Sequence, residues 1–394
     1  MRPLEGIRIL DLSRMVAGGL AGMLLADFGA DVVKLEQPGA GDPLRQWTTD
    51  GVPLWWKVYA RNKRYITLNI QASEGRALLL KMLPSFDVLL ESFIPGTMEK
   101  WGLDWDTLRA AHPKLILVRI SGWGQSGPAS RRPGLGTLVE AATGFAAMTG
   151  DPDLAPPALP SFPLADMTSG LYAANAAMFA LYHRDVHDGP GQVVDVSLFE
   201  SLFSLLGPVP AEYALSGQVR SRVGNRSRNS GPRGCYATSD GHWIAVSGST
   251  PRMAERLLEG YGLEHLLQDP RFATNEARVR HSVELDATVC EAIGERTLDE
   301  NVAIIEANQL TAHPVQTIRE IERDPHWRSQ QLLIDVPNGL TSIRMHNVIP
   351  RLSETRGEVR SPGGELGADN DAVFIGELGL GADELARLRE GGIV

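Results

Sequence analysis

The stretch GIRILDLSRMVAGGLAGMLLADFGADVVKLE, residues 6–36, decides the fold. It begins with an apolar run at 7–12, continues through a glycine-containing turn into a helical pattern, and ends in a second apolar run at 31–36. Further short runs rich in Val, Ile and Leu alternate with helical patterns at 65–70, 87–91, 115–120 and 192–198. Strands that alternate with helices predict a parallel sheet covered on both faces, which is an α/β, Rossmann-like arrangement.

The turn of this opening unit resembles a dinucleotide-binding fingerprint. AGGLAG at 17–22 approximates G-x-G-x-x-G, and Glu36 ends the second strand. Ala17 replaces the first glycine, which makes the tight turn, so the pattern disfavours a nicotinamide cofactor. The remaining glycines still allow a ligand backbone or phosphate to approach the helix N-terminus, whose unpaired N–H groups favour anions.

Composition and charge narrow the class of protein. The chain has 394 residues, 43% of them hydrophobic, and a formal net charge of -10 without a basic stripe, so we expect no nucleic-acid partner. The longest apolar stretch, 15–26, is shorter than the ~20 residues of a membrane span, and the N-terminus runs straight into a strand. We therefore expect a cytoplasmic protein without a membrane partner. Cys235 and Cys290 have no C-x-x-C spacing and are expected to be buried thiols.

The second half of the chain contains a change of domain. Residues 217–234 are rich in Arg, Ser, Asn and Gly and almost free of apolar side chains, which is typical of a linker or an ordered ligand loop. A hairpin is expected at 235–248 around Ser239-Asp240-Gly241, followed by helices. An amphipathic helix at 383–390 could pack back on the first domain.

Asp166 stands in the segment LADMTSG, residues 164–170, before a long run of small and apolar residues. Aspartate is a strong helix N-cap, so this carboxylate either caps the helix or serves as a chemical group. His183 and His187 are four residues apart but precede Gly-Pro-Gly, which indicates a helix end rather than a metal site. No H-E-x-x-H, G-x-S-x-G or P-loop motif is present in the sequence.

A compact basic cluster, Arg61-Asn62-Lys63-Arg64, precedes the run at 65–70, and Arg45 and Lys100 lie in neighbouring connections. Solubility is the ordinary explanation for such a cluster. At the ends of successive strands, however, these side chains could hold a nucleotide-like ligand with several phosphates.

Six segments keep the order and spacing of a known family. They are PLEGIRILD at 3–11, LADFGADVVKLE at 25–36, NKR at 62–64, DVLLESF at 87–93, SGWG at 121–124 and the Asp166 segment. Together they resemble the class III coenzyme A transferases, which include formyl-CoA:oxalate, carnitine and bile-acid CoA transferases and, on the same fold, the α-methylacyl-CoA racemases. The resemblance covers essentially the whole chain.

The resemblance implies a particular domain organisation. A large Rossmann-like domain is built from both chain ends, residues 1–216 and 331–394, and a small α+β domain is inserted at 217–330. Two subunits are threaded through one another as an interlocked dimer. We expect a homodimer, and a hetero-oligomer with a paralogous subunit stays open.

The resemblance also places the family's catalytic aspartate at Asp166. The implied reaction passes CoA from an acyl-CoA donor to a carboxylic acid acceptor through an aspartyl anhydride and an aspartyl-CoA thioester. We expect helix-end N–H groups to keep Asp166 ionised at neutral pH. The family's lid loop has its counterpart at 247–250, which assigns Gly248 and Ser249 to the substrate. Glu140 is expected to orient groups near the thioester.

The coenzyme A positions that the resemblance implies lie near the ends of the predicted strands. They are Val16, Ala17, Gln37, Leu68, Asn69, Ile70, Gln71, Ser92, Phe93, Ile94 and Lys100. Several differ from the oxalate enzyme, for example Val16 for glutamine and Gln37 for arginine, which disfavours oxalate and formate. WWKVYAR at 55–61 looks more like the branches that handle dicarboxylates or arylsuccinates. CoA is substrate and carrier, and no metal is expected.

Two other functions stay open. A racemase of this fold uses an Asp with a His, but the matching segment here is Gly134-Leu135-Gly136, and leucine cannot carry a proton. Glu140 near the thioester keeps that possibility open. The other is a CoA-binding or NAD-dependent protein without transferase chemistry. Because Asp166 is present, we expect this chain to be the competent member of any pair of unlike subunits.

Overall fold

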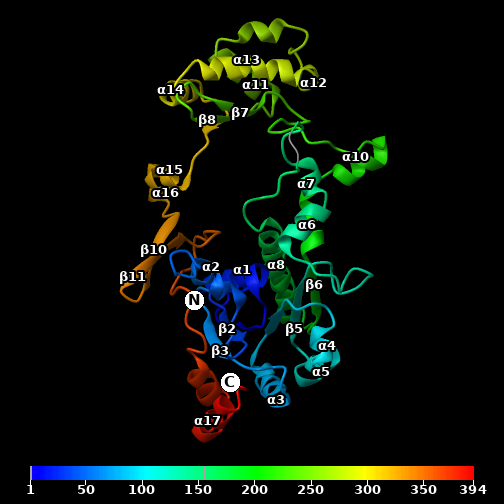
Figure 1. Cartoon of the computed structure of the whole chain (residues 1–394), viewed down its shortest axis with the longest axis vertical. Helices are drawn as coiled ribbons and strands as arrows, with labels where there is room; N and C mark the ends of the chain where they lie inside the picture. The colour runs from blue at the N-terminus through cyan, green and yellow to red at the C-terminus, as the bar shows by residue number, and fades with distance from the viewer. Residues whose placement is uncertain (1, 154–155) are drawn as a thin grey trace. The chain divides into compact units, whose positions relative to one another are not determined.

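The computed structural model of the chain describes residues 2–153 and 156–394. At its centre is a six-stranded sheet in the order β3-β2-β1-β4-β5-β6 (Figure 1). The strands are β1 (Arg8–Asp11), β2 (Asp31–Glu36), β3 (Arg64–Thr67), β4 (Val88–Glu91), β5 (Ile116–Ser121) and β6 (Val193–Ser197). Each strand pairs in parallel with its neighbours. The predicted parallel α/β sheet is therefore confirmed.

Side chains along each strand alternate between two buried clusters, one on each face of the sheet. Ile9 of β1 faces the cluster formed with α1 (Met15–Asp27) and α8 (Leu164–Val186). Leu10 faces the other cluster, formed with α3 (Ser73–Met82), α5 (Trp105–Ala111) and α17 (Ala382–Glu390). Strands buried on both faces must be apolar at consecutive positions, which explains why they read as continuous Val, Ile and Leu runs. The expected return of the C-terminal helix to this domain is confirmed.

Contacts divide the chain into two compact units. The first comprises Met1–Phe145, Pro160–Pro208 and Ser329–Val394, and the second comprises Ala146–Leu159 and Val209–Arg328. Besides the sheet and its main helices, the first unit holds α2 (Leu54–Tyr59), α4 (Thr97–Lys100), α6 (Gly136–Ala142), α9 (Leu198–Phe203) and the hairpin of β10 (Leu333–Asn338) and β11 (Thr341–His346).

The second unit has its own core. Its sheet is antiparallel, with β8 (Trp243–Ser247) between β7 (Arg233–Ala237) and β9 (Ala312–Pro314). Its longer helices are α10 (Val209–Ser216), α11 (Pro251–Gly260), α13 (Ser282–Gly294) and α14 (Leu298–Asn308), and the shorter ones include α12 (Asn275–Arg280) and α15 (Ile318–Arg323). The hairpin predicted around Ser239-Asp240-Gly241 is confirmed as β7 and β8.

One expectation about the thiols is wrong. Cys290 is exposed, and Cys235 is half-buried. Cys290 lies on α13, whose buried positions are Leu285, Val289, Ala292 and Ile293, so its side chain falls on the opposite face of that helix. In the part of the chain that the structure describes, no helix is both long and apolar enough to cross a membrane.

Candidate active site

A cavity of about 540 Å³ lies in the first unit, at the carboxyl ends of β1 to β5. The strand order reverses between β1 and β4, so the chain leaves these two strands in opposite directions and a crevice opens between their loops. Ligands of open α/β sheets bind at this place. The cavity is therefore where the fold itself provides room for a substrate.

Nine of the positions expected to bind substrate or CoA line this cavity. They are Ala17, Gln37, Leu68, Ile70, Gln71, Ser92, Phe93, Ile94 and Asp166. Other expected positions do not line it: Val16 is buried in the first turn of α1, and Lys100 is exposed at the end of α4. Asn69, whose N–H donates to the Ile393 carbonyl, and the buried Glu140 are also not among the residues that line the cavity. Gly248 and Ser249 join β8 to α11 in the second unit.

Asp166 is not the cap of its helix. Helix α8 begins at Leu164, its N-cap residue is Pro163, and Asp166 is the third helical residue. Burial, and after it the charge of the neighbouring Glu140 carboxylate, raise the pKa of Asp166 to about 6. The residue's own N–H acts in the opposite direction but is the smallest contribution. Asp166 is thus still mostly ionised at pH 7, as expected, but burial and Glu140 outweigh the helix N–H contribution that was expected to keep it so.

Gly136, the first residue of α6, leaves the space that the Asp166 carboxylate occupies. A Cβ at position 136 would lie 2.1 Å from Asp166 Oδ2 and 3.9 Å from Glu140 Oε1. Both carboxyl groups therefore lie against the same bare Cα. Any side chain at this position would push the Asp166 carboxylate aside, since it is the movable end of a side chain.

The glycines of the opening unit are not a phosphate-binding turn. Residues 17–22 lie inside helix α1, which begins at Met15. A Cβ at Gly18 would lie 2.1 Å from Ser13 Oγ, and a Cβ at Gly22 would lie 2.8 Å from Lys63 Nζ. These glycines let the helix approach its neighbours closely. Glu36, the candidate ribose ligand, is held by Arg45 through two hydrogen bonds of 2.7 Å. Its carboxylate is therefore already bound, which argues against a dinucleotide site at this turn.

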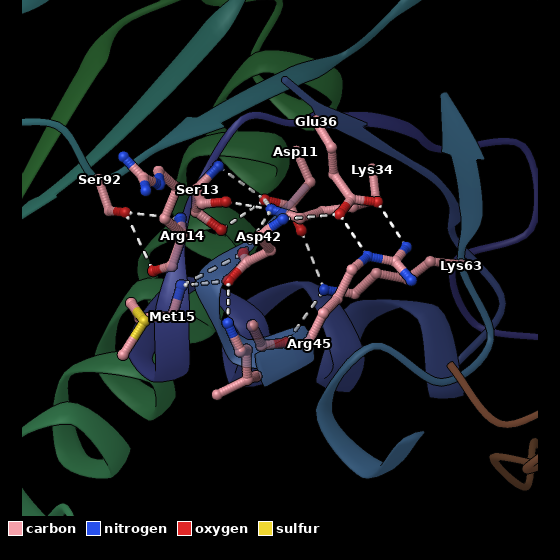
Figure 2. A network of polar contacts seen from close by, with 12 residues as sticks. Asp11, Ser13, Arg14, Met15, Lys34, Glu36, Asp42, Arg45, Lys63 and Ser92 are labelled. Atoms are coloured by element: carbon pink, nitrogen blue, oxygen red, sulfur yellow. Dashed lines mark hydrogen bonds and ion pairs between the residues drawn. The ribbon is translucent and has the colours of Figure 1, made fainter. Parts of the chain in front are cut away.

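The turn between β1 and α1 is held by polar side chains from several segments of the chain (Figure 2). The Ser13 N–H donates to Asp11 Oδ1 at 2.9 Å, and the Ser13 carbonyl accepts from Lys34 Nζ. Ser92 Oγ accepts from the Arg14 N–H at 2.8 Å. The Met15 N–H donates to Asp42 at 3.2 Å. Met15 has a φ of 64°, which is uncommon for a residue other than glycine and needs such support.

The buried charges behind this turn neutralise one another. Lys34 lies 3.7 Å from Asp11 and 3.4 Å from Asp42, and Lys63 lies 2.9 Å from Asp11. All four side chains are almost fully buried. Burial alone would raise the pKa of Asp11, but the Lys34 and Lys63 ammonium groups outweigh it and hold that pKa below its usual range. Each carboxylate in this network therefore has a cation beside it.

The basic cluster at 61–64 does not face the cavity. Arg61 is fully buried and binds Asp27 through hydrogen bonds of 3.1 and 2.6 Å, Lys63 belongs to the buried network, and Arg64 binds Asp31 and Glu377. These side chains tie α1, β3 and the C-terminal segment together. The idea that the cluster holds phosphates is therefore wrong, because each cation already has a carboxylate partner.

Two arginines that the sequence analysis did not single out line the cavity. Arg14 lies three residues after the end of β1, Arg132 lies in the connection between β5 and α6, and both are exposed. Among the described residues, no hydrogen bond or ion pair of either guanidinium is found. The position of Arg14 just after the first strand could have revealed it, because ligand groups gather at the ends of parallel strands. Arg132 lies in a long irregular connection, which carries no such signal.

Among residues 2–153 and 156–394, no group of three or more His, Cys, Asp or Glu side chains could hold a metal ion. Helix α8 ends at Val186 with His187 as its C-cap residue, so the predicted helix end at His183 and His187 is confirmed.

The fold and the cavity define a Rossmann-like α/β protein whose ligand cavity contains a partly buried carboxylate at the start of a long helix. A family model described as CoA-transferase family III matches residues 4–370. The chain therefore belongs to this family, and the predicted class of enzyme, a CoA transferase, is confirmed by its named relatives.

Three similar proteins illustrate the match. Succinyl-CoA–D-citramalate CoA-transferase of Chloroflexus aurantiacus is 41% identical over 98% of this chain and 97% of its own length. The alpha subunit of succinyl-CoA–L-malate CoA-transferase of the same organism is 35% identical, covering 100% of this chain and 92% of its own length. A crystal structure of a CAIB/BAIF family protein from Brucella suis has a TM-score of 0.84 and 30% identity, covering 96% of this chain and 99% of that one.

Proposed function

We propose that this chain transfers CoA from a dicarboxylic acyl-CoA, such as succinyl-CoA, to a second small dicarboxylic acid, with Asp166 as the covalent carrier. The observation that carries the proposal is the position of Asp166: in a chain of CoA-transferase family III, it lines the cavity at the point where the strand order reverses. The donor and acceptor class is taken from the relatives, which act on succinyl-CoA with citramalate or malate. An arylsuccinate stays within the acceptors to be tested.

The reaction proceeds by four acyl substitutions. The Asp166 carboxylate attacks the thioester carbonyl of the donor, the C–S bond breaks, and a mixed anhydride and CoA thiolate form. The thiolate then attacks the Asp166 carbonyl carbon and releases the donor acid, which leaves an aspartyl-CoA thioester. The acceptor carboxylate attacks this thioester and expels the thiolate again. The thiolate finally attacks the acceptor carbonyl, which forms the new acyl-CoA and frees Asp166.

No step in this sequence consumes or releases a proton, because a carboxylate or a thiolate enters and leaves each time. Asp166 therefore has to be ionised at the start, and its pKa of about 6 is compatible with that at pH 7. Each substitution builds negative charge on a carbonyl oxygen, which requires backbone N–H donors. In the first turn of α8 the Leu164, Ala165 and Met167 N–H groups already have acceptors, so these donors have to come from another segment. The turn at 247–250, with Gly248 and Ser249, is the candidate to close over the substrate.

The remaining cavity wall suits a CoA molecule. Leu68, Ile70 and Phe93 offer apolar surface for the adenine ring and the pantetheine arm. Arg14 and Arg132 can bind phosphate oxygens, since a guanidinium matches them with paired donors. CoA enters here as substrate and temporary carrier.

The proposed assembly is an interlocked dimer with a small inserted domain. Support comes from α8, where apolar side chains at helical spacing are exposed along one face of the helix. They are Leu171, Met178, Phe179, Tyr182 and Val186. Phe179 is 73% exposed and Tyr182 is 60% exposed, which is unusual for large apolar side chains on a 23-residue helix. A second subunit, identical or paralogous, would cover this face, and molar mass in solution tests the proposal.

Trapping the covalent carrier tests the mechanism. The full chain is incubated with succinyl-CoA and other acyl-CoAs in the presence of hydroxylamine, and peptides are analysed by mass spectrometry. We expect a hydroxamate at Asp166 that Asp166→Ala lacks. Asp195→Asn, which changes an exposed carboxylate on β6 of the same unit, should leave the adduct unchanged. Normal CoA exchange by Asp166→Ala would overturn the proposal.

The two alternative functions have their own signatures. Exchange of the α-proton with D₂O without CoA exchange would indicate a racemase, and a bound nicotinamide spectrum would indicate an oxidoreductase.

A further inference from the structure

The helix that carries Asp166 has no cap of its own. Its N-cap residue is Pro163, which offers no side-chain hydrogen bond to the first turn. Asp166 is the one acidic residue in that turn, and a carboxylate there would ordinarily bind the free N–H groups. The Leu164 and Met167 N–H groups bind the backbone carbonyls of the two residues that precede the helix, and of the N–H groups in this turn the Asp166 carboxylate interacts only with its own. The Ala165 N–H therefore needs an acceptor from another segment.

Glu140 supplies that acceptor from a different helix. Its Oε1 accepts a hydrogen bond of 3.2 Å from the Ala165 N–H, the residue immediately before Asp166. Glu140 belongs to α6 and is only 3% exposed. Among the ion pairs of the described residues, none includes Glu140 or Asp166. A buried carboxylate without a cation lowers the stability of the fold, and a second carboxylate beside it lowers it further. Such an arrangement therefore suggests a functional role.

Gly136 gives the arrangement its geometry. It lies one helical turn before Glu140 on α6, and the Cβ that it lacks would meet Asp166 Oδ2 and approach Glu140 Oε1. The bare Cα lets both carboxyl groups approach the same spot. The two side chains are therefore brought together by packing of α6 on α8, and not by a shared hydrogen-bond donor.

We propose that Glu140 is a positioning residue for Asp166: its carboxylate caps the nucleophile's helix in place of Asp166 and keeps an uncompensated negative charge beside it. The inference rests on the proposed function, because it assigns Glu140 a part in making Asp166 the carrier. Glu140 itself touches no reacting atom.

The other charged groups near α8 are engaged elsewhere. Helix α8 packs mainly against α1, α6, α9, β5 and β6. Apart from Glu140, these elements carry four charged groups: Asp27 bound to Arg61, Arg119 bound to Glu91 and Glu99, Asp195 bound to the Gln125 N–H, and Glu200 bound to Ser197. The charged groups of the cavity wall are Arg14, Lys34, Glu36, Asp42 and Arg132. Of all these, only the charge of Glu140 contributes to the shifted pKa of Asp166.

The charge has a consequence for the reaction. Repulsion between two carboxylates is present while Asp166 is free and disappears when Asp166 becomes a neutral anhydride or thioester. Glu140 thereby destabilises the resting enzyme relative to the acylated one and makes Asp166 more basic, and basicity raises the reactivity of an oxygen nucleophile. Acylation of Asp166 does not involve the hydrogen bond between Glu140 and Ala165. The two effects of Glu140, its hydrogen bond to the helix and its negative charge, can therefore be tested separately.

Glu140→Gln separates them by experiment. The amide oxygen can still accept from the Ala165 N–H, but the charge is gone. We expect the acid limb of kcat/KM, and the titration of Asp166 followed by ¹³C NMR, to move to lower pH by about one unit. Acylation above pH 7 should slow by roughly threefold to tenfold. Glu140→Asp keeps the charge but shortens the side chain, so it should lower Tm and leave the acid limb near its original pH.

Glu200→Gln is the matched control, because Glu200 lies on α9, which also packs against α8, and is bound to Ser197. It should leave the acid limb unchanged. An unshifted Asp166 titration in Glu140→Gln, or an equal shift in Glu200→Gln, overturns the inference. If the NMR titration moves as expected but no hydroxamate forms at Asp166 in the unaltered protein, the proposed function fails while the electrostatic role of Glu140 holds.

Discussion

Two groups of buried or partly buried carboxylates lie at the same edge of the sheet, and they differ in whether a cation lies beside them. Asp11 and Asp42 share Lys34, Asp11 also pairs with Lys63, and this network holds the turn after β1 in place. Asp166 and Glu140 lie close together with no cation among the described residues, and the pKa of Asp166 is raised. In the same fold, carboxylates that are paired with lysines build the wall of the cavity, and two carboxylates without a cation supply its reactive group.

The difference teaches how to separate structural from chemical charges. Removing one member of a buried ion pair leaves the other uncompensated, so such pairs are hard to change without loss of stability. A buried carboxylate without a partner already destabilises the fold, and such a cost persists at positions where function needs it. Four changes in the chain can break or sharpen this comparison.

The largest expected effect concerns the paired group. Lys34→Met should lower the free energy of unfolding by roughly 3–5 kcal/mol, because Asp42 loses its cation and the Ser13 carbonyl loses its donor. Urea denaturation measures it. Lys114→Gln, which breaks the exposed pair with Asp188, should stay within about 0.5 kcal/mol. Equal stability of Lys34→Met and the unaltered protein would mean that the paired network is not structural.

The next effect concerns the space for the unpaired group. Gly136→Ala places a Cβ where the Asp166 carboxylate lies, so the carboxylate must turn away while the helix itself tolerates alanine. We expect kcat/KM to fall by roughly 10²-fold or more with little change in Tm. Gly381→Ala, at a position with open space around it, serves as the control. Full activity in Gly136→Ala would show that the observed carboxylate position is not the reactive one.

A third change measures the cost of the unpaired charge directly. The pKa of Asp166 is about 6 in the folded chain against an ordinary 3.8, so the folded state holds the proton more tightly and ionisation costs stability as the pH rises between these values. Asp166→Asn should raise the free energy of unfolding by about 1–3 kcal/mol at pH 7 and by almost nothing at pH 4. Denaturation curves at both pH values test this, and a gain at pH 4 as large as at pH 7 would contradict it.

The smallest effect concerns Arg14, which lies in the turn that the paired carboxylates and lysines hold at the edge of the cavity. Arg14→Gln should raise KM for the acyl-CoA substrate by about tenfold, since a charge-assisted hydrogen bond to phosphate is lost, and leave kcat and Tm nearly unchanged. Arg109→Gln, on the exposed last turn of α5, should have no effect on KM. A stability loss in Arg14→Gln without a change in KM would place Arg14 with the structural charges instead.

Much of the sheet and part of the cavity could be predicted from the sequence. The runs at 7–12 and 31–36 led directly to β1 and β2, because strands buried on both faces are continuously apolar. The helical position of the glycines at 17–22 could not be predicted, since a glycine needed for close packing looks the same as one needed for a turn. The partners of Arg61 and Lys63 were also out of reach, because Asp27 and Asp11 lie more than thirty residues away in the chain.

The order of apolar and polar residues along the chain by itself determined the alternation of strands and helices, and with it a parallel sheet whose loops meet at one edge. Only the tertiary structure decided which charges at that edge are neutralised. Periodicity is a local property, and a chain of this length repeats it often enough to be recognised. The pairing of a carboxylate with a lysine, or its lack of a partner as at Asp166, depends on which distant segments pack together, and local sequence carries no record of that.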